Sequence, residues 1–214
     1  HARAIEREFR LAEASLRSEA DLAPPLRLGV LASLPTAFLT RLSARFAGPE
    51  PLVLTEGSDA ELRRKLGEGQ IDAALTLLRE GEDAASVIDE GYRMMLPASH
   101  RLAGRATLDP AELASETMIA RRSCELLAET SRFFTQRGVR PRFLLRSAND
   151  DRCMALVRGG MGVTTAPESL RCEGVVAVPL DGYDFRRRIG LIDGKTQRDD
   201  ARSALLLACD SAIV

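Results

Sequence analysis

A nearly continuous apolar run from Ile71 to Leu78, interrupted near its start by Asp72, constrains the fold more than any other feature of the sequence. Such a run is typical of a strand that helices cover on both faces. The preceding segments alternate between strand-like and helical patterns, which predicts a strand–helix–strand–helix–strand unit and therefore a parallel sheet. We expect strands at residues 26–31, 52–55 and 71–78, and helices at about 35–46 and 59–69.

Capping residues agree with these two helices. Ser33 can serve as the N-cap of the first, with Pro35 in the tolerated first turn. Ser58 and Glu61 have the spacing of a capping box at the start of the second, and Gly69 ends it. Both helices should therefore begin directly after the strands that precede them.

The rest of the chain continues this alternation. The turn Gly159–Gly162 ends a helix and re-enters a strand. It has neither the GxGxxG spacing nor a P-loop lysine, so we expect no nucleotide cofactor. The further expected strands lie at about 92–97, 117–120, 142–145, 163–165, 175–179 and 188–192, and the further helices at about 123–137, 150–158 and 196–210.

The first segment is densely charged and has helical periodicity. Ile5, Phe9, Ala12 and Leu16 fall on one face at spacings of four, three and four. This narrow stripe suits a helix that pairs with another helix, so residues 1–23 are expected to form a linker and dimerisation helix. The alternative is an amphipathic helix lying on its own domain.

Composition limits the possible partners. The net charge of −1 argues against a chain that binds a phosphate backbone by itself. No apolar stretch is long enough to span a bilayer, and the charged N-terminal segment lacks the apolar centre of a secretory signal. We therefore expect a cytoplasmic protein with no membrane partner. The missing initiator methionine suggests a piece of a longer chain.

Several motifs occur in an informative order: Leu52–Gly57, Ile71–Ala74, Pro97–Ala103, and an apolar helix that runs into Gly159–Val163. In this order and spacing they resemble the effector-binding domain of LysR-type transcriptional regulators. The resemblance covers the chain from about residue 26 to its end. It places the preceding helix where the family has its dimerising linker.

The resemblance implies an α/β fold with two Rossmann-like subdomains joined by two crossover strands, like a type II periplasmic binding protein. Subdomain I would comprise residues 24–93 plus 189–214, and subdomain II residues 94–188. The segments 92–96 and 188–192 are long enough to bridge two lobes as an antiparallel pair. Ligands of open α/β sheets bind at the carboxyl ends of strands, here in the cleft between the lobes.

The function that follows from this resemblance is allosteric. A small, anionic metabolite would bind in the cleft and control promoter DNA binding by a winged helix-turn-helix outside this sequence, in a homodimer or homotetramer. The alternative is a periplasmic solute-binding protein of a transporter. An enzyme is not expected, because no catalytic constellation is present.

The expected effector-binding residues follow the predicted strands. Ser33 lies where a helix N-terminus favours an anion, although capping alone explains it equally well. Leu77 stands where an arginine would be a common anion ligand in the family. Arg121 and Arg122, which precede a helix N-terminus in the second lobe, would supply the cation that Leu77 does not. The full expected set is Ser33, Leu34, Ser58, Thr76, Leu77, Arg121, Arg122, Ser123, Asn149 and Thr165.

Cys124 is a possible redox residue. It is expected in the first turn of a helix beside two arginines, a setting that lowers a thiol pKa. The peroxide-sensing branch of the family has a cysteine near this place and a second a few residues later, where this chain has Phe133 and Phe134. A buried, unreactive thiol is the commoner case. The cysteine spacing does not favour a metal site.

Overall fold

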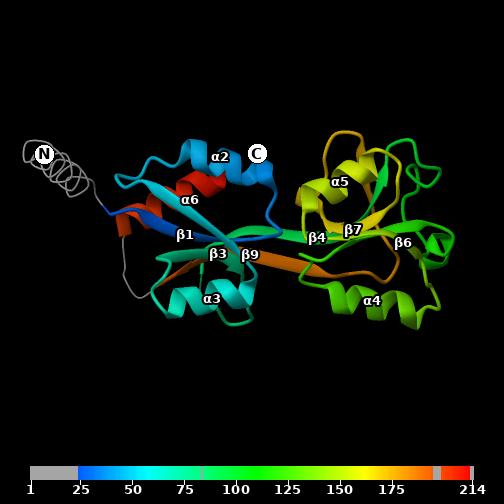
Figure 1. Ribbon diagram of the computed structural model, residues 1–214, viewed down its shortest axis with the longest axis horizontal. Helices are drawn as coiled ribbons and strands as arrows, with labels where there is room; N and C mark the ends of the chain where they lie inside the picture. Colours follow the sequence, from blue (N-terminus) through cyan, green and yellow to red (C-terminus); the bar gives the residue numbers. More distant parts are fainter. Residues whose placement is uncertain (1–23, 83, 195–198, 213–214) are drawn as a thin grey trace, which may run out of the picture.

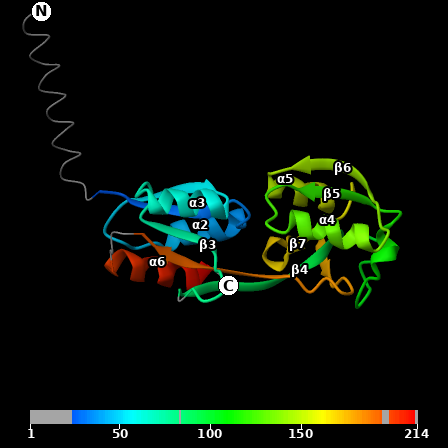
Figure 2. The ribbon, with the colours of Figure 1, turned by 90° about the horizontal axis from the view of Figure 1, so that it is seen from below.

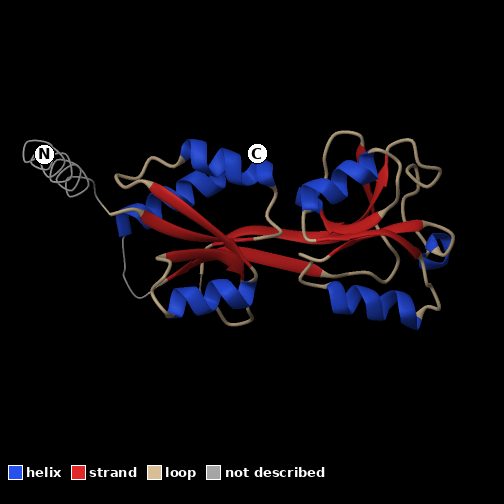
Figure 3. Cartoon of the chain, in the orientation of Figure 1, coloured by secondary structure: helices blue, strands red, loops and turns tan. Residues whose placement is uncertain are grey.

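The computed structural model describes residues 24–82, 84–194 and 199–212. The chain forms two lobes that lie side by side along the long axis of the molecule (Figure 1). In each lobe, strands form a middle layer with helices on both sides (Figure 3). The expected helix with Ile5, Phe9, Ala12 and Leu16 lies outside the described residues.

The first lobe is built on the expected parallel unit. Strand β1 pairs in parallel with β2 on one side and with β3 on the other. Leu28, Leu42 and Leu62, which come from three different elements, are fully buried in one hydrophobic core. The elements of this lobe are β1 (Leu26–Leu31), α2 (Thr36–Arg45), β2 (Leu52–Gly57), α3 (Asp59–Gly67), β3 (Ala73–Leu77) and α6 (Asp199–Ala212).

Two long antiparallel strands connect the lobes. β4 (Ser86–Pro97) and β9 (Arg186–Asp193) run from one lobe into the other (Figures 1 and 2). β9 pairs with β3 of the first lobe, whereas β4 pairs with β7 and β8 of the second. The expected fold of two α/β subdomains joined by two crossover strands is confirmed.

The second lobe has its own core. Tyr92, Met94, Phe133 and Tyr183 are buried in one cluster, and a second cluster packs beneath α5. Strands β5 and β6 are parallel. The elements of this lobe are a 3-10 turn (Pro110–Leu113), β5 (Thr117–Arg121), α4 (Leu127–Gln136), β6 (Arg142–Ser147), α5 (Asp150–Arg158), β7 (Thr164–Pro167), a second 3-10 turn (Glu168–Leu170) and β8 (Val175–Val178).

The glycine-rich turn after α5 has the predicted role. Gly160 has a φ of +74°, a backbone conformation that side chains disfavour. A Cβ atom at Gly162 would lie 2.7 Å from the carbonyl oxygen of Thr117. The turn is therefore built from glycines because the chain reverses tightly and packs against β5.

One expected helix cap and one expected helix start are wrong. α2 begins at Thr36 with Pro35 as its N-cap, so Ser33 does not cap it. α4 begins at Leu127 and not at Ser123, and the intervening residues form turns. The physical reason is tertiary: the side chains of Ser33, Ser123 and Glu125 are held by partners far away in the sequence, and these contacts outweigh the local preference.

No helix in the part of the chain that the structure describes is long and apolar enough to cross a bilayer.

Candidate functional site

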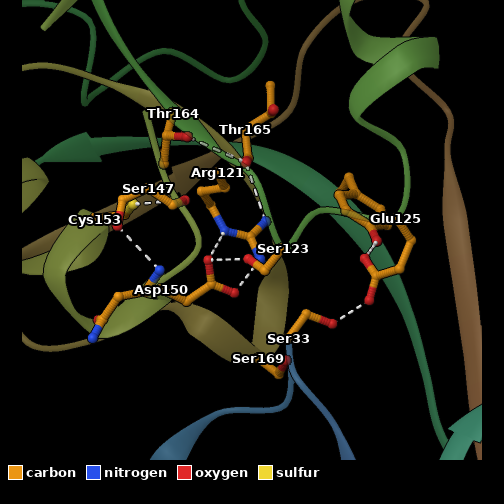
Figure 4. A network of polar contacts seen from close by, with 12 residues as sticks. Ser33, Arg121, Ser123, Glu125, Ser147, Asp150, Cys153, Thr164, Thr165 and Ser169 are labelled. Atoms are coloured by element: carbon orange, nitrogen blue, oxygen red, sulfur yellow. Dashed lines mark hydrogen bonds and ion pairs between the residues drawn. The ribbon is translucent and has the colours of Figure 1, made fainter. Parts of the chain in front are cut away.

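The lobes meet at Arg187, a buried residue of crossover strand β9. Its Nη1 donates to the hydroxyl oxygen of Ser33 over 2.7 Å and to a carboxylate oxygen of Glu125 over 2.9 Å. Ser33 follows β1 in the first lobe, whereas Glu125 follows β5 in the second. The Ser33 hydroxyl also donates directly to Glu125, as the dashed line in Figure 4 shows. A single guanidinium therefore joins both lobes.

The other side of Arg187 is fixed by Glu90. These two residues are register partners on the antiparallel strands β9 and β4, and their ion pair measures 2.8 Å. The Glu90 carboxylate also accepts from the backbone N–H of Ser169 at 2.6 Å and from its hydroxyl at 2.9 Å. Arg187 is thus held in place even without its contact to Glu125.

Glu125 is ionised although only 12% of its side chain is exposed. Tyr92 donates its hydroxyl to the second carboxylate oxygen of Glu125 over 2.8 Å. Burial alone would raise the pKa of Glu125, but the charge of Arg187 and the hydrogen bonds from Ser33 and Tyr92 outweigh it and lower that pKa. Burial, followed by the charge of Glu125, raises the pKa of Tyr92, so the phenol remains a donor.

Two grooves open beside this network. One, of about 350 Å³, is lined by residues of β3, β9 and the second lobe, among them Leu77, Glu125 and Arg187. Another, of about 240 Å³, lies between the N-terminal part of α2 and one face of α5 and includes Ser169. Thr36 and Asp151 form a hydrogen bond of 2.6 Å across the lobes near the second groove. A small molecule could reach the network through either groove.

Arg121 and Arg122, the expected pair of cleft-facing arginines, differ from each other in burial and in their partners. Arg121 is 2% exposed and makes a bidentate pair with Asp150, at 2.8 and 2.5 Å. Ser123 donates to the same carboxylate at 2.7 Å (Figure 4). Burial alone would lower the pKa of Arg121, but the hydrogen bonds with Asp150 raise it. The charge of Arg121 is therefore already matched inside the second lobe, and Arg122 is exposed.

The remaining expected site residues are spread over several structural roles. Ser58 forms the predicted capping box with Glu61, and Asn149 caps α5. Thr76 is buried and donates to Asp59 over 3.0 Å. Leu34 is part of the first core and Leu77 lines the larger inter-lobe groove, whereas Thr165 lies beside Arg121. Within the expected set, the structure brings Ser33 and Leu77 to the meeting point of the lobes.

Cys124 lies in the turn before α4 and is 9% exposed. It lines a pocket of about 390 Å³ inside the second lobe, between α4 and the strands β5 and β6. Burial raises the pKa of its thiol, although the charge of Arg121 opposes this shift. The expected low-pKa environment is therefore not present, because burial of the thiol outweighs the charge of Arg121.

We expect Cys172 to be the fast-reacting thiol of the folded chain. Cys124, Cys153 and Cys209 are buried, and burial raises the pKa of each, that of Cys209 to about 12. Each unit of pKa lowers the thiolate fraction roughly tenfold at neutral pH. Titration with a chromogenic disulfide should thus show one fast equivalent, absent in Cys172→Ser. A fast equivalent assigned to Cys124 would contradict this.

Sequence reasoning missed Glu90, Tyr92, Glu125 and Arg187. A signal for two of them was present: Glu90 and Arg187 are opposite charges just ahead of the segments 92–96 and 188–192, which were predicted to pair as antiparallel strands, and they do face each other. Opposite charges on facing strands stabilise each other, most strongly where water is excluded. Glu125 gave no such signal, because its partner Ser33 lies 92 residues away.

Known proteins share both the sequence pattern and the fold. The family description "LysR substrate binding domain" matches residues 19–209. A probable hydrogen peroxide-inducible genes activator of Mycobacterium avium is 29% identical over 220 residues, which cover 99% of this chain and 68% of that protein.

Solved structures agree on the fold. The reduced OxyR regulatory domain from Pseudomonas aeruginosa has a TM-score of 0.69 and 20% identity, with 90% of this chain and 98% of that chain covered. The effector-binding domain of BenM with its effector benzoate has a TM-score of 0.61 and 18% identity, with coverages of 88% and 91%. The fold is thus the two-lobed, type II periplasmic-binding-protein-like fold of regulatory domains. The chain belongs to the LysR substrate binding domain family, which consists of transcription regulators and not enzymes.

Proposed function

We propose that this chain senses a small, anionic metabolite, which binds where the lobes meet and changes promoter DNA binding by a domain outside this sequence. The protein would act in the cytoplasm as a homodimer or homotetramer. The observation that carries the proposal is the buried network of Ser33, Glu125 and Arg187, because it links both lobes through one cation. A ligand that competes for these groups must alter the lobe arrangement.

The choice of an anion rests on the donors at this point. The Ser33 hydroxyl, the Tyr92 hydroxyl and the Arg187 guanidinium all donate toward one carboxylate. Guanidinium and hydroxyl donors of this kind bind carboxylates well. The BenM domain, whose effector is benzoate, is a relative with the same fold and a carboxylate ligand. Arg187 takes the role in the cleft that the sequence suggested for Arg121 and Arg122.

The test combines ligand binding with DNA binding. A thermal-shift screen of small carboxylates should find at least one that stabilises the chain, by about 2.7 kcal/mol at a hundredfold excess over Kd. That ligand should also change operator affinity of the complete regulator, since its effect depends on different affinities for two lobe arrangements.

Matched serine variants locate the site. Ser33→Ala should lose the ligand-induced shift, whereas Ser58→Ala should keep it because Ser58 caps α3 on the surface. Binding that survives Ser33→Ala would place the site elsewhere. A ligand that binds at Ser33 without any effect on operator affinity would refute the proposed regulation.

A further inference from the structure

We propose that Glu125 occupies the position of a ligand carboxylate, and that the cleft binds a small carboxylate by exchanging it for this side chain. The inference rests on the proposed function and specifies how the same site is filled before any ligand arrives. It identifies Glu125 as an internal competitor of the ligand.

The geometry around Glu125 is that of a bound carboxylate. One oxygen accepts from the hydroxyl of Ser33 and from Arg187 at 2.9 Å, and the other accepts from Tyr92 at 2.8 Å. The three donors come from the β1–α2 connection, β9 and β4, so different parts of the chain converge on a single group. Both oxygens are thereby satisfied, as a buried carboxylate requires.

The donors do not depend on Glu125 for their positions. Arg187 is anchored by Glu90 through its Nε at 2.9 Å, and its guanidinium carbon lies 5.9 Å from the centre of the Tyr92 ring. Tyr92 itself is fully buried in the core of the second lobe. If the Glu125 side chain leaves, a preorganised set of donors for a carboxylate remains.

The charge balance favours exchange over simple addition. The described side chains of this network carry one guanidinium, Arg187, and two carboxylates, Glu90 and Glu125. A ligand anion added beside both would place three carboxylates around one buried cation, which is unfavourable in a site of low dielectric. A ligand that replaces Glu125 leaves the net charge unchanged and reuses every donor.

Glu125 also has room to move. It lies in the irregular segment between β5 and α4, which no strand or helix ladder holds. Its side chain borders the groove of about 350 Å³, which Arg186 and Arg188 also line. A displaced Glu125 can therefore turn toward solvent beside positive charge. The hydrogen bond between Ser33 and Glu125 links the two lobes. After the exchange, the bound ligand would make this link in place of the Glu125 side chain.

Chemical rescue tests this exchange on the chain itself. Glu125→Ala should lower the melting temperature by about 5 °C or more, because Arg187 loses one of its buried partners. Sodium acetate or formate should restore stability in a saturable manner, compared with sodium chloride at equal concentration. Glu129→Ala, which removes a carboxylate from the first turn of α4, is the matched control.

The expected result is an acetate-induced shift in Glu125→Ala at least tenfold larger than in the wild type or in Glu129→Ala. Equal shifts in all three proteins, or none in folded Glu125→Ala, would overturn the inference. So would stronger rescue by methylammonium chloride, because it would show a cation site. If Glu125→Ala does not fold, Glu125→Gln should show the same acetate preference, since an amide competes less well for Arg187.

This experiment needs neither DNA nor the natural metabolite. A failed metabolite screen would count against the proposed function and leave the acetate result standing. Conversely, if acetate does not restore the stability of Glu125→Ala, the exchange is refuted. A metabolite that changes operator affinity would still support the proposed function.

Discussion

Replacing Asp150 with alanine is expected to lower the free energy of unfolding by about 3–5 kcal/mol, the usual cost of removing one partner from a buried ion pair. The side chains of Asp150 and Arg121 are 7% and 1% exposed, and they form a bidentate contact with a shortest distance of 2.5 Å. Without Asp150, the Arg121 guanidinium would remain buried without its matching charge. Such a loss is a large part of the stability of an ordinary domain.

The neighbouring residue supplies the control. Asp151 also lies in the first turn of α5, so Asp151→Ala removes the same favourable charge at a helix N-terminus. Asp151 is exposed, and its substitution should cost about 1 kcal/mol or less. Urea unfolding of both variants measures the difference. Equal losses for the two variants would mean that the Arg121–Asp150 pair contributes no specific stabilisation.

Replacing Arg187 with methionine should be equally severe at neutral pH, at about 3–5 kcal/mol, because Glu90 and Glu125 would be left buried without their shared cation. The effect should depend on pH. In the wild type the pKa of Glu125 is lowered, so its stabilising contribution is present above the ordinary glutamate pKa of about 4.3 and is lost as the pH falls through the lower folded value.

In Arg187→Met, Glu125 lacks its cation, so burial should raise the pKa of this carboxyl, and its protonation in acid should relieve the cost. The stability gap between wild type and variant should therefore narrow from pH 7 to pH 4 in urea unfolding. Arg186→Met is the control, since Arg186 pairs with Asp89 on the surface and should show a small, pH-independent effect. A gap that widens in acid would contradict this assignment of charges.

Much of the architecture could be predicted from local patterns. The apolar run at 71–78 indicated a strand covered on both faces, and successive residues of β3, Ala73 to Thr76, are indeed all buried. The capping box at Ser58 and the range of α5 were predicted correctly. These features depend on residues close in sequence, where periodicity and capping act directly.

The site could be predicted only in part. Ser33 and Leu77 were expected where the lobes meet, and both lie there. Arg121 was expected to be available to a ligand, but it is paired with Asp150, 29 residues further along the chain. No local pattern shows which of many charged residues will be paired, because an ion pair of this kind forms only when separate elements pack.

The sequence by itself determined the order of strands and helices, the parallel unit of the first lobe and the motifs that place the chain in its family, because these follow from spacing along the chain. The tertiary structure alone decided where the charges are matched. Ser33, Glu125 and Arg187 lie as much as 154 residues apart, yet form one buried network. The reason is desolvation: once folding removes water, each buried charge must find a partner from another part of the chain.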